Sequence, residues 1–114
     1  MGIVSLDFEI IRATPAVAEL LVHVELDVPA VDCEVCGRAV GPRCPGVSTV
    51  EVSYPMTTSK VSDTSVSLRC VIPEPNLWTV EVPFTYVVII DVRQGRDVVE
   101  TRNGVVALRA AKGH

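Results

Sequence analysis

The residues of this chain best suited to chemistry are its four cysteines. Cys33 and Cys36 stand in a Cys-x-x-Cys-Gly segment, Cys44 follows shortly after it, and Cys70 comes much later. A Cys-x-x-Cys-Gly turn is typical of a zinc knuckle, and four thiolates can complete a tetrahedral zinc site. A zinc ribbon needs a second Cys-x-x-Cys pair, however, whereas Cys44 and Cys70 stand apart. The zinc pattern is therefore incomplete.

Three states of these cysteines stay open from the residues alone. We favour inert, partly buried thiols over a disulfide among Cys33, Cys36 and Cys44, and over zinc bound by all four. Cys70 falls on the inward face of a predicted strand, where a free cysteine behaves as a small hydrophobic residue. Redox catalysis is disfavoured because no helix N-terminus is encoded to lower the thiol pKa. We expect no cofactor, with zinc as the less favoured alternative.

Carboxylates are the second set with catalytic potential, but their spacing argues against a catalytic pair. Most alternate with core positions, which favours a solvated strand face, and these are Glu9, Glu25, Glu51, Glu81 and Asp91. His23, the histidine within the predicted fold, also falls on the outward face of its strand. Because no nucleophile with a base is indicated, we expect no catalytic residues and no enzymatic activity from this chain alone.

Composition narrows the class of protein further. The chain has 114 residues, 48% hydrophobic and 21% charged, which suits one folded domain with one core. Its net charge of −4 comes from scattered carboxylates, so we expect no nucleic-acid partner, which would need clustered Lys and Arg. The longest apolar run, 86–90, is far shorter than the ~20 residues that span a bilayer, and no signal peptide is visible. We expect a soluble protein without a membrane partner, of unknown compartment.

Alternating hydrophobic and polar residues predict strands along most of the chain, because a half-buried strand has a period of two. Predicted strands cover residues 3–12, 19–28, 34–40, 48–54, 65–72, 84–92 and 97–102. Their inward residues include Val4, Leu6, Phe8, Ile10, Leu20, Val22, Val24, Leu26, Val28, Val50, Val52, Tyr54, Val66, Leu68, Cys70 and Ile72. Segment 84–92 is apolar on both faces, which suits a middle strand covered on both sides or docked against a neighbour. The polar segment 55–65 is predicted to be a connecting loop.

A short helix is the alternative for residues 14–24, with Thr14 as its N-cap and Pro15 in its first turn. We favour the strand because the alternation continues and is rich in valine. About seven strands at this spacing predict an all-β fold, an immunoglobulin-like β-sandwich of two antiparallel sheets. One domain is expected over residues 1–112, and Gly113 and His114 fit a tag remnant.

The aromatic residues are concentrated in one corner of the sequence. Three of the five, Trp78, Phe84 and Tyr86, lie within the proline-interrupted segment 73–86. Its prolines stiffen a chain that must cross from one sheet to the other, and they remove exposed backbone donors. Trp78 can then plug the open end of the core, and the Tyr86 hydroxyl can bind nearby backbone, as in a tyrosine corner. A sugar-stacking platform on Trp78 is the less favoured interpretation.

This corner also carries a family resemblance. Pro75, Leu77-Trp78, four further residues, Pro83-Phe84 and then Tyr86 resemble the signature that closes the immunoglobulin-like domain of glycoside hydrolase family 2. That family comprises β-galactosidases, β-glucuronidases and β-mannosidases. The resemblance continues through an apolar strand and a glycine turn to residue 104. It departs from the family at Asn103 and Val105, where the family has aromatic residues.

The resemblance implies a non-catalytic spacer or scaffold domain, in which Leu77, Trp78, Pro83, Phe84 and Tyr86 form a structural corner. Its partners would be the sugar-binding and catalytic barrel domains of a parent glycosidase, and carbohydrate is a second candidate partner. The family's catalytic glutamates lie on a separate barrel of about 250 residues, which this chain cannot contain. The alternative is a stand-alone module that binds carbohydrate or protein.

Overall fold

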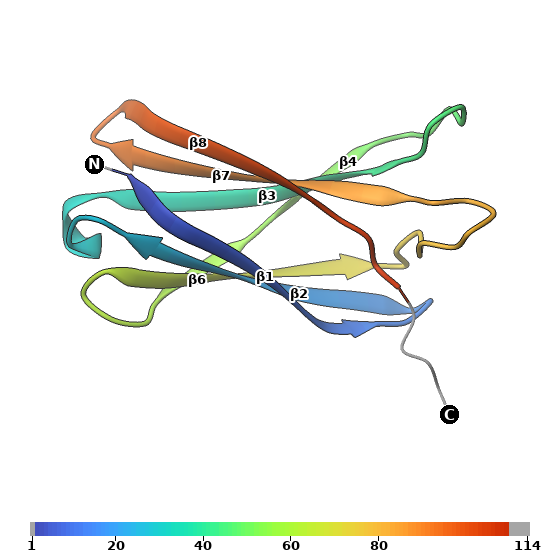
Figure 1. Cartoon of the computed structure of the whole chain (residues 1–114), viewed down its shortest axis with the longest axis horizontal. Helices are drawn as coiled ribbons and strands as arrows, with labels where there is room; N and C mark the ends of the chain where they lie inside the picture. The colour runs from blue at the N-terminus through green and yellow to red at the C-terminus, as the bar shows by residue number, and fades with distance from the viewer. Residues whose placement is uncertain (1, 110–114) are drawn as a thin grey trace.

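The computed structural model describes residues 2–109, which form two four-stranded antiparallel sheets packed face to face (Figure 1). The strands are β1 (Ile3–Ala13), β2 (Val17–Leu26), β3 (Glu34–Arg43), β4 (Val52–Pro55), β5 (Thr57–Lys60), β6 (Ser65–Pro73), β7 (Thr85–Gln94) and β8 (Asp97–Val106). A short 3-10 helix, η1 (Ala30–Asp32), precedes β3. Gly113 and His114, expected to be a tag remnant, and the end of the predicted domain at 112 lie outside the described residues.

The strand order confirms the predicted fold class. Sheet A has the order β1-β2-β6-β5 and sheet B the order β4-β3-β7-β8. This is the arrangement of an immunoglobulin constant-type sandwich with one additional short strand, β4, beside β3. The fold is therefore an all-β sandwich with eight strands among the described residues, against about seven predicted.

The inner faces of the two sheets form one hydrophobic core. Every second residue of β2 from Ala18 to Leu26 and of β6 from Val66 to Ile72 is buried, as the alternation predicts. Tyr86, Val88, Ile90 and Val92 of β7 meet them from sheet B. No helix forms over 14–24, because Thr14 instead closes the β1–β2 turn, where its hydroxyl accepts from the Val17 amide at 3.1 Å.

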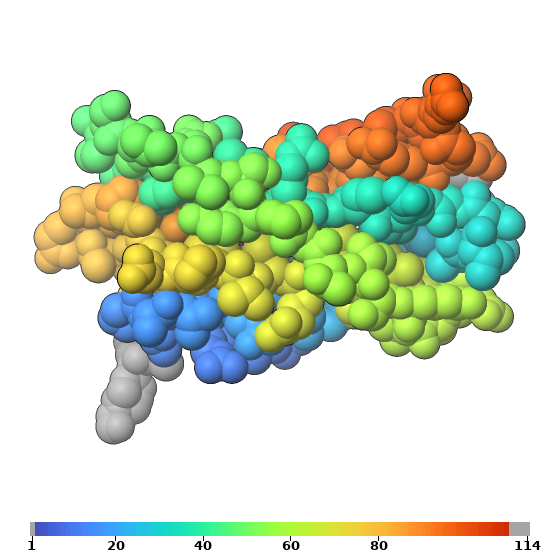
Figure 2. All heavy atoms as spheres, turned by 180° about the vertical axis from the view of Figure 1, so that it is seen from behind, coloured from blue at the N-terminus to red at the C-terminus, as the bar shows by residue number. Residues whose placement is uncertain are grey.

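The polar segment 55–65 was predicted to be a connecting loop, and this prediction is wrong for residues 57–60, whereas 61–64 do connect two strands. Residues 57–60 form β5, the edge strand of sheet A, paired with β6. All four of its side chains are exposed, so the strand has no apolar alternation that a sequence pattern could reveal. With only Met56 between them, β4 and β5 carry the chain from sheet B to sheet A, and Figure 2 shows this crossing in green.

Four residues predicted to face inward are exposed instead. Val4 lies in a β-bulge, so that Ile3 takes the buried position, while Ile10 lies on edge strand β1 and is 42% exposed. Val50 precedes β4, and Val52 begins this edge strand, where each remains exposed. Bulges and sheet edges change which residues are covered without changing the alternation itself.

The chain start joins the two sheets along the edge formed by β1 and β8. Glu100 of β8 accepts a hydrogen bond from the Ile3 amide at 2.6 Å, and Arg102 donates to the Ile3 carbonyl at 2.9 Å. Arg102 also donates to Glu100 at 2.8 Å. The hydrogen bond from the Ile3 amide is the largest cause that lowers the pKa of Glu100 below its ordinary value of 4.5.

We therefore expect Glu100→Gln to weaken the acid dependence of stability. A carboxyl group whose pKa is lower in the folded than in the unfolded state stabilises the fold at pH values above its unfolded pKa. For Glu100 this stabilisation is lost as the pH falls below about 4.5. The melting temperature of the wild type should fall more steeply below that pH than that of Glu100→Gln, as measured by circular dichroism. Glu81→Gln, at an exposed position, is the control. If the melting temperatures of wild type and Glu100→Gln fall equally steeply below that pH, the stabilising role given to the Glu100 carboxylate is wrong.

Candidate functional site

The crossing from β6 to β7 is built around one buried tyrosine. Tyr86 is 1% exposed, and its hydroxyl accepts a hydrogen bond from the Asn76 backbone amide at 2.9 Å. The hydroxyl thus binds backbone within the crossing segment, as the sequence predicts. Burial is the main cause that raises the Tyr86 pKa above its ordinary value. The buried tyrosine is therefore a structural anchor of the crossing.

Neighbouring strands leave space for the Tyr86 ring. The Tyr54 ring of β4 meets it edge to face, with the ring centroids 6.4 Å apart. A Cβ atom at Gly41 of β3 would lie 2.7 Å from a Tyr86 ring carbon, so this position requires glycine. The anchor is thereby held by β3, β4 and the crossing segment together.

We predict that Tyr86→Phe lowers the free energy of unfolding by about 1–3 kcal/mol, because the Asn76 amide loses its acceptor. Chemical denaturation followed by circular dichroism measures the change. Tyr54→Phe is the matched control, since the half-buried Tyr54 is only an edge neighbour, and it should change stability by less than about 0.5 kcal/mol. Equal stability of Tyr86→Phe and wild type would show that the hydroxyl anchor contributes nothing.

Trp78 lies at the same corner but outside the hydrophobic core. Its side chain is half-buried, its amide donates to the Leu108 carbonyl at 2.9 Å, and the Arg109 guanidinium lies 4.2 Å from its ring centroid. Leu108, in contrast, is fully buried. Of the other predicted corner residues, Leu77 packs against the core, and Pro83 and Phe84 are half-buried. Tyr86 and Leu108 thus fill the place in the core that was predicted for Trp78.

This placement lowers the expected cost of removing Trp78. We predict that Trp78→Ala lowers the unfolding free energy by about 1–2 kcal/mol, for the lost cation–π contact and partial burial. Leu108→Ala, which empties a core position, should cost about 2–5 kcal/mol. Denaturant titration of both variants tests the order. A larger loss of unfolding free energy for Trp78→Ala than for Leu108→Ala would show that Trp78, and not Leu108, closes this end of the core.

The four cysteines of the zinc pattern do not meet. All are free thiols: Cys33 follows η1, Cys36 lies on β3, and Cys44 and Cys70 are buried. Burial raises the pKa of Cys70 to about 11, and burial is also the main cause that raises the pKa of Cys33 and of Cys36. Within residues 2–109, no group of three or more metal-ligating side chains could hold a metal ion. The geometry thus supports neither a disulfide nor a zinc site here.

A serine, a histidine and a glutamate meet on the outer face of sheet A, which the sequence analysis missed. His23 Nε2 lies 2.9 Å from Glu9, and His23 Nδ1 lies 3.2 Å from the Ser67 hydroxyl. Cross-strand register brings them together, because Ser67 of β6 pairs with His23 of β2. A hydrolase would also need amide donors aimed at an oxyanion, whereas β2, between β1 and β6, uses its backbone in the sheet ladders. We therefore interpret the trio as a surface hydrogen-bond network.

Sheet B presents an unexpected outer face. Val40, Val87 and Ile89 are half-buried and Val105 is 65% exposed. The register places Val87 between Val40 of β3 and Val105 of β8, while Ile89 lies between Arg38 and Asn103. We call Val40, Val87, Ile89 and Val105 the outer stripe. The sequence signal for it was the apolar character of 84–92 on both faces. The stripe shows that β7 is covered on one face only within this domain.

Several hollows lie on the surface of the described residues. Among them, a cavity of 390 Å³ opens beside η1, and one of 220 Å³ lies beside His23. A third, of 460 Å³, lies at the aromatic corner and is lined by Tyr54, Asn76 and Phe84 among others. Within residues 2–109, no helix is long and apolar enough to cross a membrane.

Comparisons with models of known families, with curated proteins and with solved structures find no match. The resemblance of residues 73–104 to glycoside hydrolase family 2 therefore rests on its motif alone and stays a prediction.

Proposed function

We propose that this chain is a non-catalytic immunoglobulin-like scaffold domain, of the kind found in glycoside hydrolase family 2, that packs against a neighbouring domain of a parent glycosidase. The outer stripe carries this proposal. The outer face of an antiparallel sheet is commonly polar, whereas here Val87 of β7 faces outward between Val40 and Val105. Ile89, the next outward residue of β7, lies between Arg38 and Asn103. Contiguous exposed apolar surface marks a site of contact with another protein surface.

Two further observations support a scaffold over an enzyme. The one serine–histidine–glutamate arrangement described above lies on a flat, solvated sheet face, where the His23 and Glu9 side chains are 43% and 57% exposed. The corner motif of the resemblance serves packing in this chain, because Tyr86 and Leu77 both contact the core. Both observations fit a domain whose work is to hold other domains in position.

The outer stripe gives a matched pair of variants for a test. Ile89 faces outward and the next residue, Ile90, is fully buried. We predict that Ile89→Thr reduces concentration-dependent association of the purified domain while changing its stability by less than about 1 kcal/mol. Ile90→Thr should cost about 2–4 kcal/mol, since it buries a hydroxyl and leaves a void. Analytical ultracentrifugation and denaturant titration measure both effects.

The outer stripe is not a contact surface if the domain is monomeric at all concentrations and Ile89→Thr does not change the binding of a surface dye. The family assignment is tested separately by the encoding reading frame, which should continue into a family 2 barrel, and by the lack of turnover of nitrophenyl glycosides by the isolated domain.

The alternative is a stand-alone carbohydrate-binding module, and the hollow at the aromatic corner is the observation that favours it. The hollow combines the ring of Phe84 with the polar side chains of Asn76, Ser48 and Thr49. Trp78 is less suited to stack on a sugar because the Arg109 guanidinium lies over its ring. Saturable oligosaccharide binding in calorimetry, lost in Phe84→Ala, would favour the module and overturn the scaffold.

A further inference from the structure

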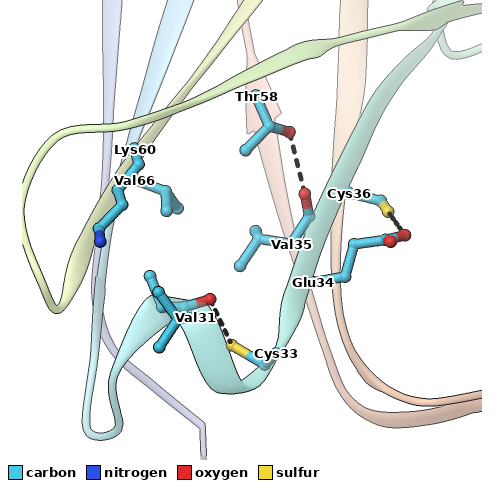
Figure 3. A pocket seen from close by; sticks show the side chains of 9 residues that line it. Val31, Cys33, Glu34, Val35, Cys36, Thr58, Lys60 and Val66 are labelled. Atoms are coloured by element: carbon cyan, nitrogen blue, oxygen red, sulfur yellow. Dashed lines mark hydrogen bonds between the residues drawn. The ribbon is translucent and has the colours of Figure 1, made fainter.

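The cavity of 390 Å³ beside η1 lies at one open end of the sandwich, between the start of β3 and strands β5 and β6 (Figure 3). Its apolar lining comes from Ala30, Val31, Val35 and Val66. Val35 and Val66 are core residues, 6% and 5% exposed, so the deepest part of the cavity reaches the core itself. Val31 stands at the mouth and is 73% exposed.

The cavity exists because no large side chain is available to fill it. β5, which borders it, is a polar edge strand, and the Thr58 hydroxyl is already used in a hydrogen bond to the Val35 carbonyl at 2.9 Å. None of the lining residues is aromatic. An apolar site of this size is in the range of small-molecule sites, which are typically about 300–1,000 Å³.

Lys60 is the one positively charged residue among those that line the cavity. Its ion pair with Asp63 is long, at 3.9 Å, and the Asp63 side chain is 97% exposed, so water screens the pair. Glu34 also borders the cavity, but its carboxylate accepts from the Cys36 thiol at 3.1 Å, and Figure 3 shows both side chains turned away from Val31 and Val66. The cavity thus joins an apolar interior to the positive charge of Lys60, and the other charged lining residue, Glu34, is turned away from that interior.

We propose that this cavity binds a small amphiphilic carboxylate, with its hydrocarbon part against Val35 and Val66 and its carboxylate at Lys60. The positive charge of Lys60 favours a carboxylate over an amine. The apolar lining favours a ligand with a hydrocarbon chain over acetate. Each methylene buried should tighten binding by about fourfold. This inference concerns the end of the sandwich beside η1 and is independent of the scaffold role proposed for the outer stripe.

The Cys33 thiol gives a local readout of occupancy. Cys33 lines the cavity and is half-buried, and its thiol lies 3.9 Å from the Ala30 carbonyl. In a Cys36→Ser background, Cys33 is the remaining cysteine that is not buried, because Cys44 and Cys70 are. Iodoacetamide labelling of Cys33, followed by mass spectrometry, should therefore slow when the cavity is filled. Absence of labelling at Cys70 reports that the protein stays folded.

Octanoate is the probe, with octylamine, octanol and acetate at equal concentrations for comparison. We expect octanoate to protect Cys33 saturably and to shift the methyl resonances of Val35 and Val66, while acetate does neither. Lys60→Met should weaken octanoate binding about threefold to tenfold and leave octanol binding unchanged. Arg43→Met, which removes a cation that does not line the cavity, should leave octanoate binding unchanged.

The proposal is overturned if octanoate gives neither protection nor a shift. It is equally overturned if octylamine binds as tightly as octanoate, or if Lys60→Met binds octanoate like wild type, since each shows that the charge at Lys60 selects nothing.

Discussion

The fold depends on satisfying one hydroxyl inside the core. Tyr86 brings a large ring into a sandwich of small aliphatic residues, and its polar end must find a partner because an unpaired buried hydroxyl is costly. The Asn76 amide supplies that partner, which fixes the path of the chain between the sheets. The ring in turn requires glycine at position 41 of β3. One side chain therefore sets the relation between β3, β7 and the crossing segment.

The same strand that carries this anchor also gives the domain its outward apolar surface. β7 lies between β3 and β8, and its inward residues Tyr86, Val88 and Ile90 are covered by sheet A. Its outward residues Val87 and Ile89 have only side chains of their own sheet beside them. The outer face of β7 is therefore apolar at Val87 and Ile89 and is not covered within this domain. Under the proposed scaffold role, a neighbouring domain covers it.

Alternation predicted the fold class and most of the core, because both sheets have one inner face and the pattern has the same period. It could not predict β5, whose polar side chains face solvent and whose place is set by backbone pairing with β6. It placed Val4 inward because a bulge leaves no mark in the pattern. At the candidate site, the Tyr86 anchor was predictable from residue type and proline spacing. The cavity was not, since it arises where the adjacent elements η1 and β3 meet β5 and β6, which come later in the sequence.

The two ends of the sandwich differ because aromatic residues are scarce. Tyr54, Trp78, Phe84 and Tyr86 all lie at the corner end, where rings and Leu108 close the core. The fifth aromatic residue, Phe8, contacts Gly104 along the edge between β1 and β8. No ring remains for the end beside η1, and valine side chains are too short to close it. Because the large aromatic side chains lie at the crossing from β6 to β7, an apolar cavity remains at the opposite end of the sandwich, with Lys60 at its border.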